Sequence, residues 1–583
     1  MNQSLEHKRH TLAHLLAAAV IDKYPHAKLT LGPAIETGFY YDVDFSGGDA
    51  PGDDDLKDLQ KRMKKTINKW TEFTHEIVTA DKAREVFADN EYKLELVNEI
   101  DERGESITLY TCGDFTDLCR GGHTENPKEE IAMDAFRLDK IAGAYWRGDE
   151  KNTMLTRIYG IAFDTKEELE EYNKMILEAK ARDHRKLGKE LDLFTFSDLV
   201  GSGLPLFTPN GTLMRDLIVE KIMKIQAKYG YKKVTIPHIT KSDLYKTSGH
   251  WEKFGDELFK VKGQSDVEFV MKPMNCPHHT QIFASKPHSY KDLPIRYAES
   301  TMVYRDEQAG ELMGLSRVRS ITQDDGHVFC TLDQVDQEVE NIVLVIKEFY
   351  DSLGMFSDDQ FWVSLSVRNL EEPDEYLGDT RNWEKAEQML DNVTRRLGLP
   401  SKQIAGEAAF YGPKIDFMFK DAIGREWQLA TAQLDFVMPE RFGLEYTDNE
   451  GNKQTPVMIH RAVAGSLERF MAVIIEHFAG NFPLWLAPQQ VAIIPVSEAH
   501  NEYASEIFKS LQEAGLRVEM NDSSESMGKK IRQAKKMKLP YFIVIGDKEI
   551  ETKTVTLESR DTGEPVVISV NELLDKLHTE MNV

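Results

Sequence analysis

Arginine and glutamate side chains flank the loop of a predicted β-hairpin in the middle of the chain. Its strands are predicted over residues 297–304 and 317–327, with a polar loop between them. Arg305 and Glu307 are two residues apart, so an extended chain points both side chains to one face. Arg317 and Arg319 repeat this spacing on the return strand. Because guanidinium groups bind phosphate bidentately and stay charged, the hairpin suits a polyphosphate. The alternative is a solvated hairpin with surface ion pairs.

Histidine and cysteine side chains in the N-terminal part form a second candidate site. His10 and His14 lie one turn apart on a helix predicted over residues 5–23. The apolar face of that helix carries Leu12, Leu15, Leu16 and Ala19. Cys119 and His123 have the same spacing as the first pair. Three histidines and a cysteine are a suitable zinc set, and the same groups could instead grip a polar substrate.

Several domains are needed to position these groups, and 583 residues are enough for three or four. A charged helix is predicted over 165–187, with a capping box between Thr165 and Glu168, and it is typical of a connector. From residue 191 strands and loops predominate, with helices predicted near 212–229 and 331–354. From residue 488 apolar strands alternate with amphipathic helices, which indicates a βαβ-type domain.

Charge and cysteine content limit the classes of function. The 72 basic and 98 acidic residues give a net charge of −26, which argues against a protein that coats nucleic acid. One basic run, residues 529–538, stands out and favours local phosphate contacts over an ordinary solvated helix face. No apolar run reaches membrane-spanning length, so no membrane association is expected. Four widely spaced cysteines indicate a reducing compartment, and we expect a cytoplasmic protein.

Ordered motifs along the chain resemble those of one enzyme family. Arg305-x-Glu307 with the arginine-rich return strand resembles motif 2 of class II aminoacyl-tRNA synthetases, and GSLERF (465–470) resembles motif 3. YKKVTIP (231–237) with GHWEKFGDELF (249–259) resembles the motif 1 region. The segments MKPMNCPHH, TQDDGH, YGPKIDF, QLDF and PVMIHR are similar to threonyl-tRNA synthetases, in that family's order and over nearly the whole chain.

The resemblance implies an α+β multidomain fold. It places an α+β editing domain at 1–164, a helical linker at 165–190, a class II catalytic domain on a mostly antiparallel sheet at 191–487, and an α/β anticodon-binding domain at 488–583. Many members of the family carry an additional small N-terminal ubiquitin-like domain, and this sequence is expected to begin directly at the editing domain. The activity implied is that of a threonine–tRNA ligase with hydrolytic editing of mischarged seryl-tRNA(Thr).

Adenylate formation is implied for the hairpin and its neighbours. By resemblance, Arg305 holds the α-phosphate of ATP, Arg469 the γ-phosphate and Glu307 the adenine amino group, with Lys414 beside the adenylate and Mg²⁺ accompanying ATP. Further implied ATP- and substrate-binding residues are Arg317, Gln323, Asp325, Tyr411, Gln428, Thr431 and Ser466. Two positions depart from the family: Ile321 replaces an aromatic residue and Met313 a histidine, which is expected to weaken stacking on adenine.

A catalytic zinc, one per chain, is implied at Cys276, His327 and His460. No local spacing links these residues, and each alone is an ordinary buried cysteine or histidine. Three protein ligands leave a tetrahedral position open, as in a working zinc site. Threonine and valine are near-isosteres that an apolar pocket separates poorly. A metal that coordinates the amino and hydroxyl groups of threonine rejects valine, and Asp325 is implied to take the amino group.

Serine keeps the hydroxyl and lacks one methyl, a difference worth roughly 10–200-fold, so a second hydrolytic site is required. The resemblance assigns it to His10, His14, Asp117, Cys119 and His123. In the family this site works through water and polar side chains, so zinc is the less favoured interpretation here. Gly122 stands where the family usually has proline, which predicts a less rigid loop.

The anticodon-binding domain carries the thinnest resemblance. The family reads the anticodon with a glutamate after GDK, here Glu549. An arginine expected in the following strand is replaced by Glu558, and Arg560 could substitute from the same strand face. The basic run at 529–538 would bind phosphates without regard to sequence. The implied partners are tRNA(Thr), ATP and L-threonine, with a homodimer through motif 1.

Other functions fit the sequence less well. A silent tRNA-binding relative needs neither Arg305 and Arg469 nor the three zinc ligands. A freestanding metallohydrolase built on the N-terminal cluster leaves most of the chain without a role. Among synthetases, the zinc set argues against a prolyl enzyme, and the N-terminal cluster argues against a seryl enzyme.

Overall fold

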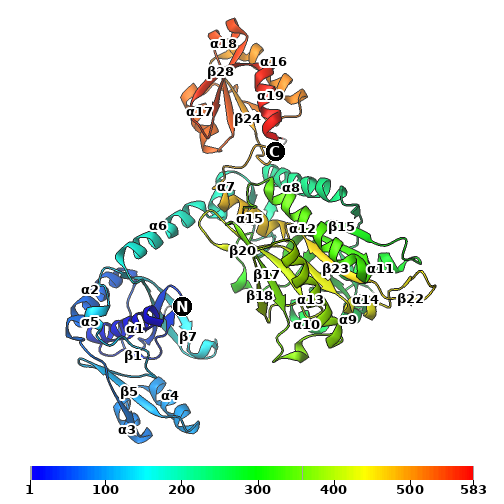
Figure 1. The fold of residues 1–583 in the computed structure, drawn as a ribbon. Coiled ribbons are helices and arrows are strands. Elements are labelled where there is room, and N and C mark those ends of the chain that lie inside the picture. Colours follow the sequence, from blue (N-terminus) through cyan, green and yellow to red (C-terminus); the bar gives the residue numbers. More distant parts are fainter. Residues whose placement is uncertain (1–2, 265, 358, 582–583) are drawn as a thin grey trace. The chain divides into compact units, whose positions relative to one another are not determined.

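The structure is a computed structural model that describes residues 3–264, 266–357 and 359–581. The chain divides into two compact units, Met1–Leu177 and Glu178–Val583 (Figure 1), and each is described by itself. Within the described ranges, no helix has both the length and the apolar character needed to cross a membrane.

The N-terminal unit is built around the helix predicted from the histidine pair. This helix, α1, runs over Gln3–Lys23, and its predicted apolar face is fully buried. It packs on an antiparallel sheet in the order β1-β3-β8-β7, with β2 beside β3. The bounds are Lys28–Leu29 (β1), Ala34–Ile35 (β2), Gly38–Asp44 (β3), Phe136–Tyr145 (β7) and Met154–Ala162 (β8). Burial of α1 places His14 in the interior and His10 one turn away, near the surface.

A smaller antiparallel sheet completes this unit. It consists of β4 (Thr74–Val78), β5 (Ile107–Cys112) and β6 (Phe115–Leu118). The helices beside the two sheets are α2 (Leu56–Thr66), α3 (Ala80–Val86), α4 (Glu91–Glu102) and α5 (Pro127–Glu130). Strand β6 ends one residue before Cys119, so this sheet places Cys119 and the loop to His123 close to α1.

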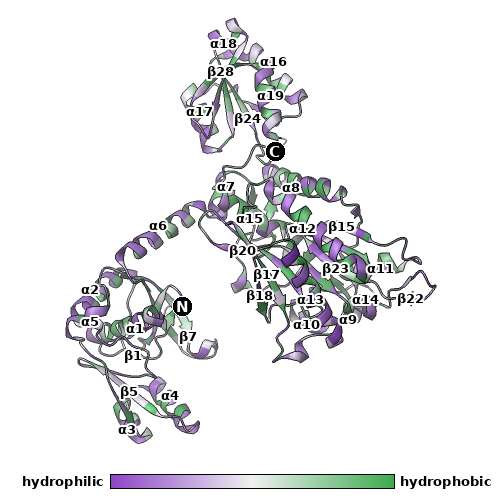
Figure 2. Cartoon of the chain, viewed as in Figure 1, coloured by the Kyte–Doolittle hydropathy of each residue, from purple (hydrophilic) through white to green (hydrophobic). Residues whose placement is uncertain are grey.

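The charged connector is two helices, α6 (Lys166–Arg182) and α7 (His184–Glu190). The predicted capping box forms: Thr165 Oγ1 accepts from the Glu168 N–H, and a Glu168 carboxylate oxygen accepts from the Thr165 N–H. The prediction of one continuous helix over 165–187 was wrong. Asp183 has non-helical backbone angles, and its carboxylate accepts from the Arg185 N–H, so it ends the first helix and caps the second. Figure 2 shows α6 as largely hydrophilic.

The centre of the second unit is an eight-stranded sheet in the order β11-β15-β16-β23-β20-β19-β17-β18. All neighbours are antiparallel except β11–β15 and β17–β18, which confirms the predicted mostly antiparallel sheet. The bounds are Lys232–Lys233 (β11), Ile295–Tyr304 (β15), Ser320–Cys330 (β16), Phe361–Val367 (β17), Ser401–Ala405 (β18), Lys414–Lys420 (β19), Glu426–Asp435 (β20) and Val457–Ala462 (β23).

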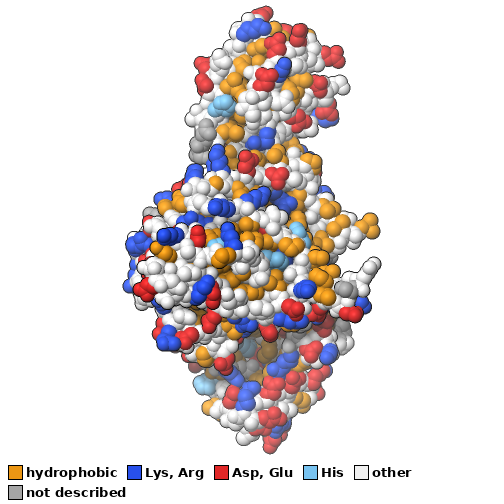
Figure 3. Space-filling view, turned by 90° about the vertical axis from the view of Figure 1, so that its right-hand side faces the viewer, with side chains coloured by type: hydrophobic (Ala, Val, Ile, Leu, Met, Phe, Trp, Pro, Cys, Tyr) orange, Lys and Arg blue, Asp and Glu red, His pale blue; other side chains and the backbone are white. Residues whose placement is uncertain are grey.

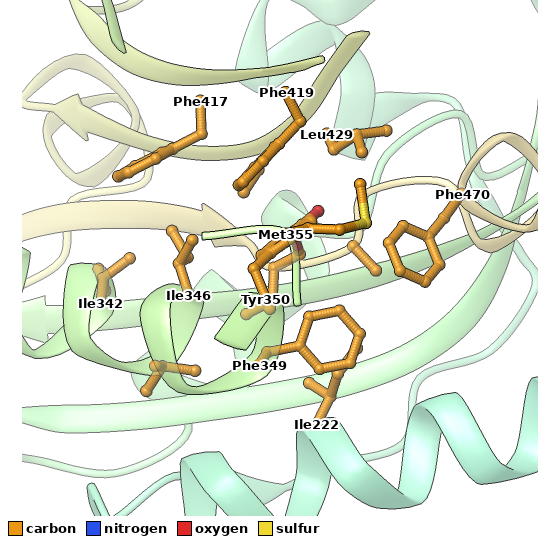
Figure 4. Packing of buried hydrophobic residues seen from close by; sticks show 14 of the residues in the cluster. Ile222, Ile342, Ile346, Phe349, Tyr350, Met355, Phe417, Phe419, Leu429 and Phe470 are labelled. Carbon is orange, nitrogen blue, oxygen red and sulfur yellow. The ribbon is translucent and has the colours of Figure 1, made fainter. Parts of the chain in front are cut away.

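The two faces of this sheet have different character because side chains alternate along each strand. One face is apolar and packs against α8 (Pro209–Ala227), α12 (Val335–Asp351) and α15 (Leu467–His477). Figure 4 shows this packing: Ile342, Ile346 and Tyr350 of α12 lie toward Phe417 and Phe419 of β19, whereas Phe349 lies on the side of Ile222 and Phe470. The opposite face carries the polar and titratable side chains that form the candidate site.

The C-terminal domain has the predicted α/β character. Its sheet order is β25-β24-β26-β27-β28, parallel among the first three strands and antiparallel beyond them. The strands are Val518–Met520 (β25), Val491–Pro495 (β24), Tyr541–Ile545 (β26), Thr554–Ser559 (β27) and Pro565–Ser569 (β28). The helices are α16 (Asn501–Glu513), α17 (Met527–Lys536), α18 (Asp547–Thr552) and α19 (Val570–Met581).

Candidate functional site

Strand register brings the three predicted zinc ligands together on the polar face of the central sheet. His327 on β16 lies directly opposite His460 on β23, so both imidazoles point to the same side. Cys276 is the first residue of α11 (Cys276–Ala284), which lies over that side. The Nε2 atom of His327 is 3.1 Å from the Nδ1 atom of His460, and the ligand atoms of all three residues lie within 4.8 Å of one another. All three side chains are buried.

Two further residues, which the sequence did not point out, bind the outer nitrogens of the two imidazoles. Asp435 Oδ2 is 2.9 Å from His460 Nε2, and His279 Nδ1 is 2.7 Å from His327 Nδ1. These contacts leave His327 Nε2 and His460 Nδ1 as the inward atoms. Metal-bound histidines characteristically donate their other ring N–H to such a partner, which fixes the tautomer. The donor set of one sulfur and two nitrogens therefore fits a zinc ion with an open position.

Buried charges around this cluster favour neutral ligands in the absence of a cation. Burial, with repulsion from His279, His460 and Arg461, lowers the pKa of His327 well below its ordinary value. Burial, with Asp325 and Asp435 nearby, raises the pKa of the Cys276 thiol well above its ordinary value. Neutral imidazole is the form that ligates a metal. A divalent ion would supply the positive charge that the thiolate form of Cys276 requires.

The predicted amino-acid side of the site surrounds the cluster. Asp325 is buried two residues before His327 on the same strand face, and it accepts a 3.0 Å hydrogen bond from Asn275. Burial raises the pKa of Asp325. Tyr411 stacks on the His460 ring with centroids 4.9 Å apart, and its hydroxyl lies 2.7 Å from Gln433 Oε1. Gln433, directly opposite His460, is a further polar residue that sequence reasoning missed.

A β-bulge explains how Gln428 and Thr431 share this face although they are three residues apart. The pairing of β19 with β20 shifts between Phe417 and Met418, so Gln428 pairs with Met418 while Thr431 pairs with Asp416. Gln428 nevertheless lies further along the strand from His460 than Thr431 does. Among the described residues, the buried Thr431 Oγ1 has no hydrogen-bond partner, which leaves it available to a substrate.

The predicted phosphate-binding hairpin is not a solvated surface feature. The carboxylate of Glu307 is buried and accepts a 2.7 Å hydrogen bond from Arg317 Nε. Burial lowers the pKa of Arg305, and repulsion from Arg469 lowers it further. The carboxylates of Glu257 and Glu307 raise this pKa but do not outweigh burial. Desolvation and repulsion from Arg317 likewise lower the pKa of Arg469. Guanidiniums that repel one another in this way are stabilised by a bound polyanion.

The remaining predicted residues of this site are placed around the same hairpin. Lys414 Nζ lies 2.7 Å from Asp416, and Gln323 forms an isolated bridge with Ser466, the N-cap of α15. Strand β16 begins at Ser320 rather than at the predicted position 317. The Arg319 N–H is bonded to the Gly203 carbonyl and its guanidinium to the Glu307 carbonyl, so the chain joins the ladder only afterwards. Ile321 is half-buried, and the Met313 side chain is exposed.

In the N-terminal unit, the four predicted residues form one compact cluster. The Cys119 sulfur lies 3.5 Å from His10 Nε2 and 3.3 Å from His123 Nε2, and the Nε2 atoms of His10 and His14 are 3.3 Å apart. The cluster borders a cavity of about 390 Å³. Burial opposes ionisation of the thiol, but hydrogen bonds from His10, His123 and His14 outweigh it and lower the pKa of Cys119 to about 3. The contacts with these histidines therefore favour the thiolate form of Cys119.

A buried charge network supports this cluster from below. Asp117 Oδ2 lies 3.3 Å from His14 Nδ1 and 2.5 Å from the Tyr41 hydroxyl, while its Oδ1 lies 2.5 Å from Lys93 Nζ. Burial opposes ionisation of the Asp117 carboxyl group, but the charges and hydrogen bonds of Lys93 and His14 outweigh burial and lower the pKa of Asp117. Burial likewise opposes protonation of His14, but Asp117 and Cys119 raise its pKa to about 9. Lys93 was missed because nothing in its sequence context distinguishes it from a solvated lysine of α4.

The loop after Cys119 is shaped by two glycines. Gly121 and Gly122 have φ angles of +98° and +85°. A proline, which holds φ near −65°, could not adopt the backbone conformation of Gly122. The carbonyl of Gly122 is 3.2 Å from His10 Nδ1, which fixes the Nε2 atom of His10 toward the sulfur. The greater flexibility expected of this loop stays a prediction.

In the C-terminal domain, the predicted anticodon residues have internal partners. Glu549 is buried; its carboxylate accepts from the Thr556 hydroxyl (2.5 Å) and from the Gly546 N–H (2.9 Å), which caps α18. Arg560 follows the end of β27, so the premise that it lies on the strand was wrong. Its guanidinium donates to the carbonyls of Lys538 and Phe482. The anticodon assignments of both residues stay predictions.

The basic run at 529–538 is also partly engaged. Lys529 pairs with Glu525, Lys535 with Glu558, and Lys530 is buried. Lys538 donates to the Ala479 carbonyl. Within the part of the chain that the structure describes, the basic residues of this run without an ion pair or hydrogen bond to another side chain or carbonyl are Arg532 and Lys536.

An antiparallel sheet with a guanidinium cluster at one end of a hairpin, together with an α/β C-terminal domain, defines a class II aminoacyl-tRNA synthetase. Comparisons with known proteins agree. Residues 259–478 match the class II core domain of the Gly, His, Pro, Ser and Thr tRNA synthetases, 490–580 the anticodon-binding domain, and 107–159 the second additional domain of threonyl and alanyl tRNA synthetases.

Individual relatives narrow this class. The chain is 46% identical over 556 residues to a threonine–tRNA ligase of Rubrobacter xylanophilus, covering 95% of this chain and 85% of the relative. It is 48% identical over 569 residues to that of Gloeobacter violaceus, with coverages of 96% and 90%. A solved structure described as the RNA-binding domain of Cryptosporidium parvum threonyl-tRNA synthetase has a TM-score of 0.65 at 37% identity, covering 68% of this chain and 98% of that one. The chain belongs to the threonyl-tRNA synthetase family and is a threonine–tRNA ligase.

Proposed function

We propose that this ligase selects threonine with a zinc ion, one per chain, held by Cys276, His327 and His460. The observation that carries the proposal is the pair of inward ring nitrogens 3.1 Å apart, with a buried sulfur beside them and both outer nitrogens held. When bound, zinc supplies a Lewis acid for the amino and hydroxyl groups of the substrate. Asp325 binds the amino group of the threonine substrate, and Thr431 and Gln433 border the space for its side chain.

Arg305 and Arg469 position ATP for attack by the threonine carboxylate on the α-phosphate, with Mg²⁺ accompanying the nucleotide. The attack forms a bond between a carboxylate oxygen and the α-phosphorus and releases diphosphate. Arg305 holds the α-phosphate and Arg469 the γ-phosphate, so the charge that develops on both groups is neutralised in place. Glu307, held by Arg317, accepts from the adenine amino group, and Lys414 lies beside the adenylate.

The experiment is ATP–diphosphate exchange with threonine, serine and valine in parallel, combined with elemental analysis. Threonine should exchange fastest, serine roughly 10–200-fold more slowly and valine far below both, because valine offers no hydroxyl. Purified enzyme should contain about one zinc per chain, and Cys276→Ser should lose both zinc and exchange. Active enzyme without zinc would exclude this mechanism.

We propose that the N-terminal cluster hydrolyses seryl-tRNA(Thr). The side chains of His10, His14 and Cys119 line the cavity, where they hold a water for attack on the ester carbonyl, and His123 contacts the Cys119 sulfur beside it. The new bond joins the water oxygen to the serine carbonyl carbon, and the bond to the ribose oxygen breaks. Asp117 orients His14 in this arrangement. A second zinc in this cluster is the less favoured alternative, and a second equivalent in the elemental analysis would reveal it.

We further propose that the enzyme is a cytoplasmic homodimer whose subunits meet through the motif 1 region. Its four cysteines are free, which supports a reducing compartment. Acidic and basic side chains are intermixed on the face shown in Figure 3, which is consistent with local phosphate contacts by tRNA(Thr). Sedimentation equilibrium at several concentrations tests the dimer, and a monomer mass throughout would exclude it.

A further inference from the structure

The buried imidazole of His184, at the start of α7, has no part in the sites described above. Its Nδ1 atom lies 2.6 Å from Glu476 Oε1, and its Nε2 atom lies 3.1 Å from the backbone nitrogen of Leu315. A backbone N–H can only donate, so Nε2 accepts and the ring proton resides on Nδ1, which donates to Glu476. Asp183, His184 and Glu476 have metal-type donors, but the hydrogen bonds already satisfy both ring nitrogens.

Glu476 gives His184 a fixed anchor on α15, the helix that also carries Arg469. Its second carboxylate oxygen is bound by Arg425. Burial opposes ionisation, but the hydrogen bonds from His184 and Arg425 lower the pKa of Glu476, so it stays a carboxylate. Arg182 adds hydrogen bonds to the carbonyls of Glu476 (3.2 Å) and His477 (2.8 Å) in the last turn of α15. The chain entering α7 is therefore tied to α15 at two adjacent points.

The other side of His184 holds the loop between β15 and β16, which we call the nucleotide loop (residues 305–319). Leu315 is fully buried, and its N–H has His184 as acceptor. The next residue, Ser316, accepts a 3.1 Å hydrogen bond from Arg469 Nε through its carbonyl. The residue before, Gly314, has φ +52°, and a Cβ there would lie 2.3 Å from His184 Nε2. The loop thus contacts the imidazole directly. The peptide unit between Leu315 and Ser316 is held on one side by His184 and on the other by Arg469.

We propose that His184 is a positioning residue for ATP binding: it holds the Leu315–Ser316 segment in the place from which Ser316 fixes the guanidinium of Arg469. This inference rests on the assignment of Arg469 to the γ-phosphate. His184 touches no substrate and acts through the loop. Without its acceptor, the buried Leu315 N–H must find another partner, and the loop and the Arg469 side chain shift together.

Two substitutions separate the two hydrogen bonds of the ring. His184→Asn keeps a donor near the position of Nδ1 and removes the acceptor for Leu315. His184→Gln places a carbonyl oxygen near the position of Nε2 and can accept from Leu315. In ATP–diphosphate exchange, His184→Asn should raise the KM for ATP roughly fivefold or more. The KM for threonine should stay within about twofold of the parent, and His184→Gln should recover most of the loss.

Amide hydrogen exchange measured without nucleotide reports on the conformation of the loop independently of enzyme activity. The amides of segment 312–317 should exchange faster in His184→Asn than in the parent, and close to the parent rate in His184→Gln. Lys186→Asn is the matched control, because Lys186 is exposed on the same helix, α7, and lies outside the nucleotide loop. It should change neither measurement.

The outcomes distinguish this inference from the proposed function. Equal effects of both His184 variants, or equal losses for ATP and threonine together with a lower Tm, would show a general structural role and overturn it. Unchanged exchange of segment 312–317 in His184→Asn would overturn it as well. A parent enzyme that shows no threonine-dependent exchange would instead refute the proposed function, while the hydrogen-exchange result would still report on the loop.

Discussion

In the proposed zinc site, Asp435 is expected to determine which nitrogen of His460 faces the metal, and the single substitution Asp435→Asn tests this. Asp435 is fully buried: Oδ2 accepts from His460 Nε2 at 2.9 Å, and Oδ1 accepts the N–H groups of Val437 and Met438, both at 2.8 Å. In Asp435→Asn the backbone contacts hold the amide oxygen in the Oδ1 position. The amide NH₂ group then faces His460 Nε2, which must become an acceptor, so the ring proton moves to the inward Nδ1.

A protonated Nδ1 cannot ligate a metal. Zinc binding in this variant therefore requires the other tautomer of His460, in which the Nε2–H group faces the N–H groups of the introduced amide and is disfavoured. Loss of such an outer partner typically costs 10–100-fold in metal affinity, and we expect a loss of about that size here. The assay is zinc competition against a chromophoric chelator, with the KM for threonine measured in parallel. Asp448→Asn is the control, because Asp448 also accepts backbone N–H groups in an exposed turn. Zinc affinity within about threefold of the parent would refute the reasoning.

Three further outcomes are expected. His14→Ala should leave threonine adenylation unchanged and let seryl-tRNA(Thr) accumulate; clearance at the parent rate would refute the editing assignment. Because the pKa of the Cys119 thiol is lowered to about 3, its alkylation rate should be independent of pH from about pH 5 to 8. Over the same range, the alkylation rate of an ordinary thiol of pKa about 8.5 rises roughly tenfold for each pH unit. Free cysteine, whose thiol has an ordinary pKa, is the control, and a Cys119 profile that rises with pH would exclude the thiolate. Glu549→Gln should weaken the cognate anticodon by roughly 1–3 kcal/mol relative to altered ones, and equal losses for all tRNAs would show that the base contact lies elsewhere.

Much of the fold was predictable from local patterns. The apolar face of α1, the capping box before α6 and the alternation that gives the central sheet its two faces are properties of residues close together in the chain. The three proposed zinc ligands were identified instead from motif resemblance, since Cys276 and His460 are far apart in sequence. The structure explains why they meet: antiparallel register places His327 directly opposite His460.

The residues that were missed act through tertiary contacts that leave no local pattern. His279 and Asp435 matter because their side chains reach the outer nitrogens of two histidines on other strands. Lys93 matters because α4 buries its ammonium against Asp117. The wrong predictions share a cause as well. The break at Asp183 and the position of Arg560 beyond β27 are both decided by side-chain and backbone hydrogen bonds that periodicity does not encode.

The anticodon-binding domain shows how far charge patterns can be taken. From sequence, the run at 529–538 offers six basic groups to tRNA, but ion pairs, burial and a backbone carbonyl engage four of them. Counterion release scales with the number of phosphates that free cations neutralise. Arg532 and Lys536 are therefore the groups of this run expected to set the salt dependence of tRNA binding. Since Lys535 pairs with Glu558, the contribution of Lys535 to phosphate binding is partly cancelled by this neighbouring carboxylate.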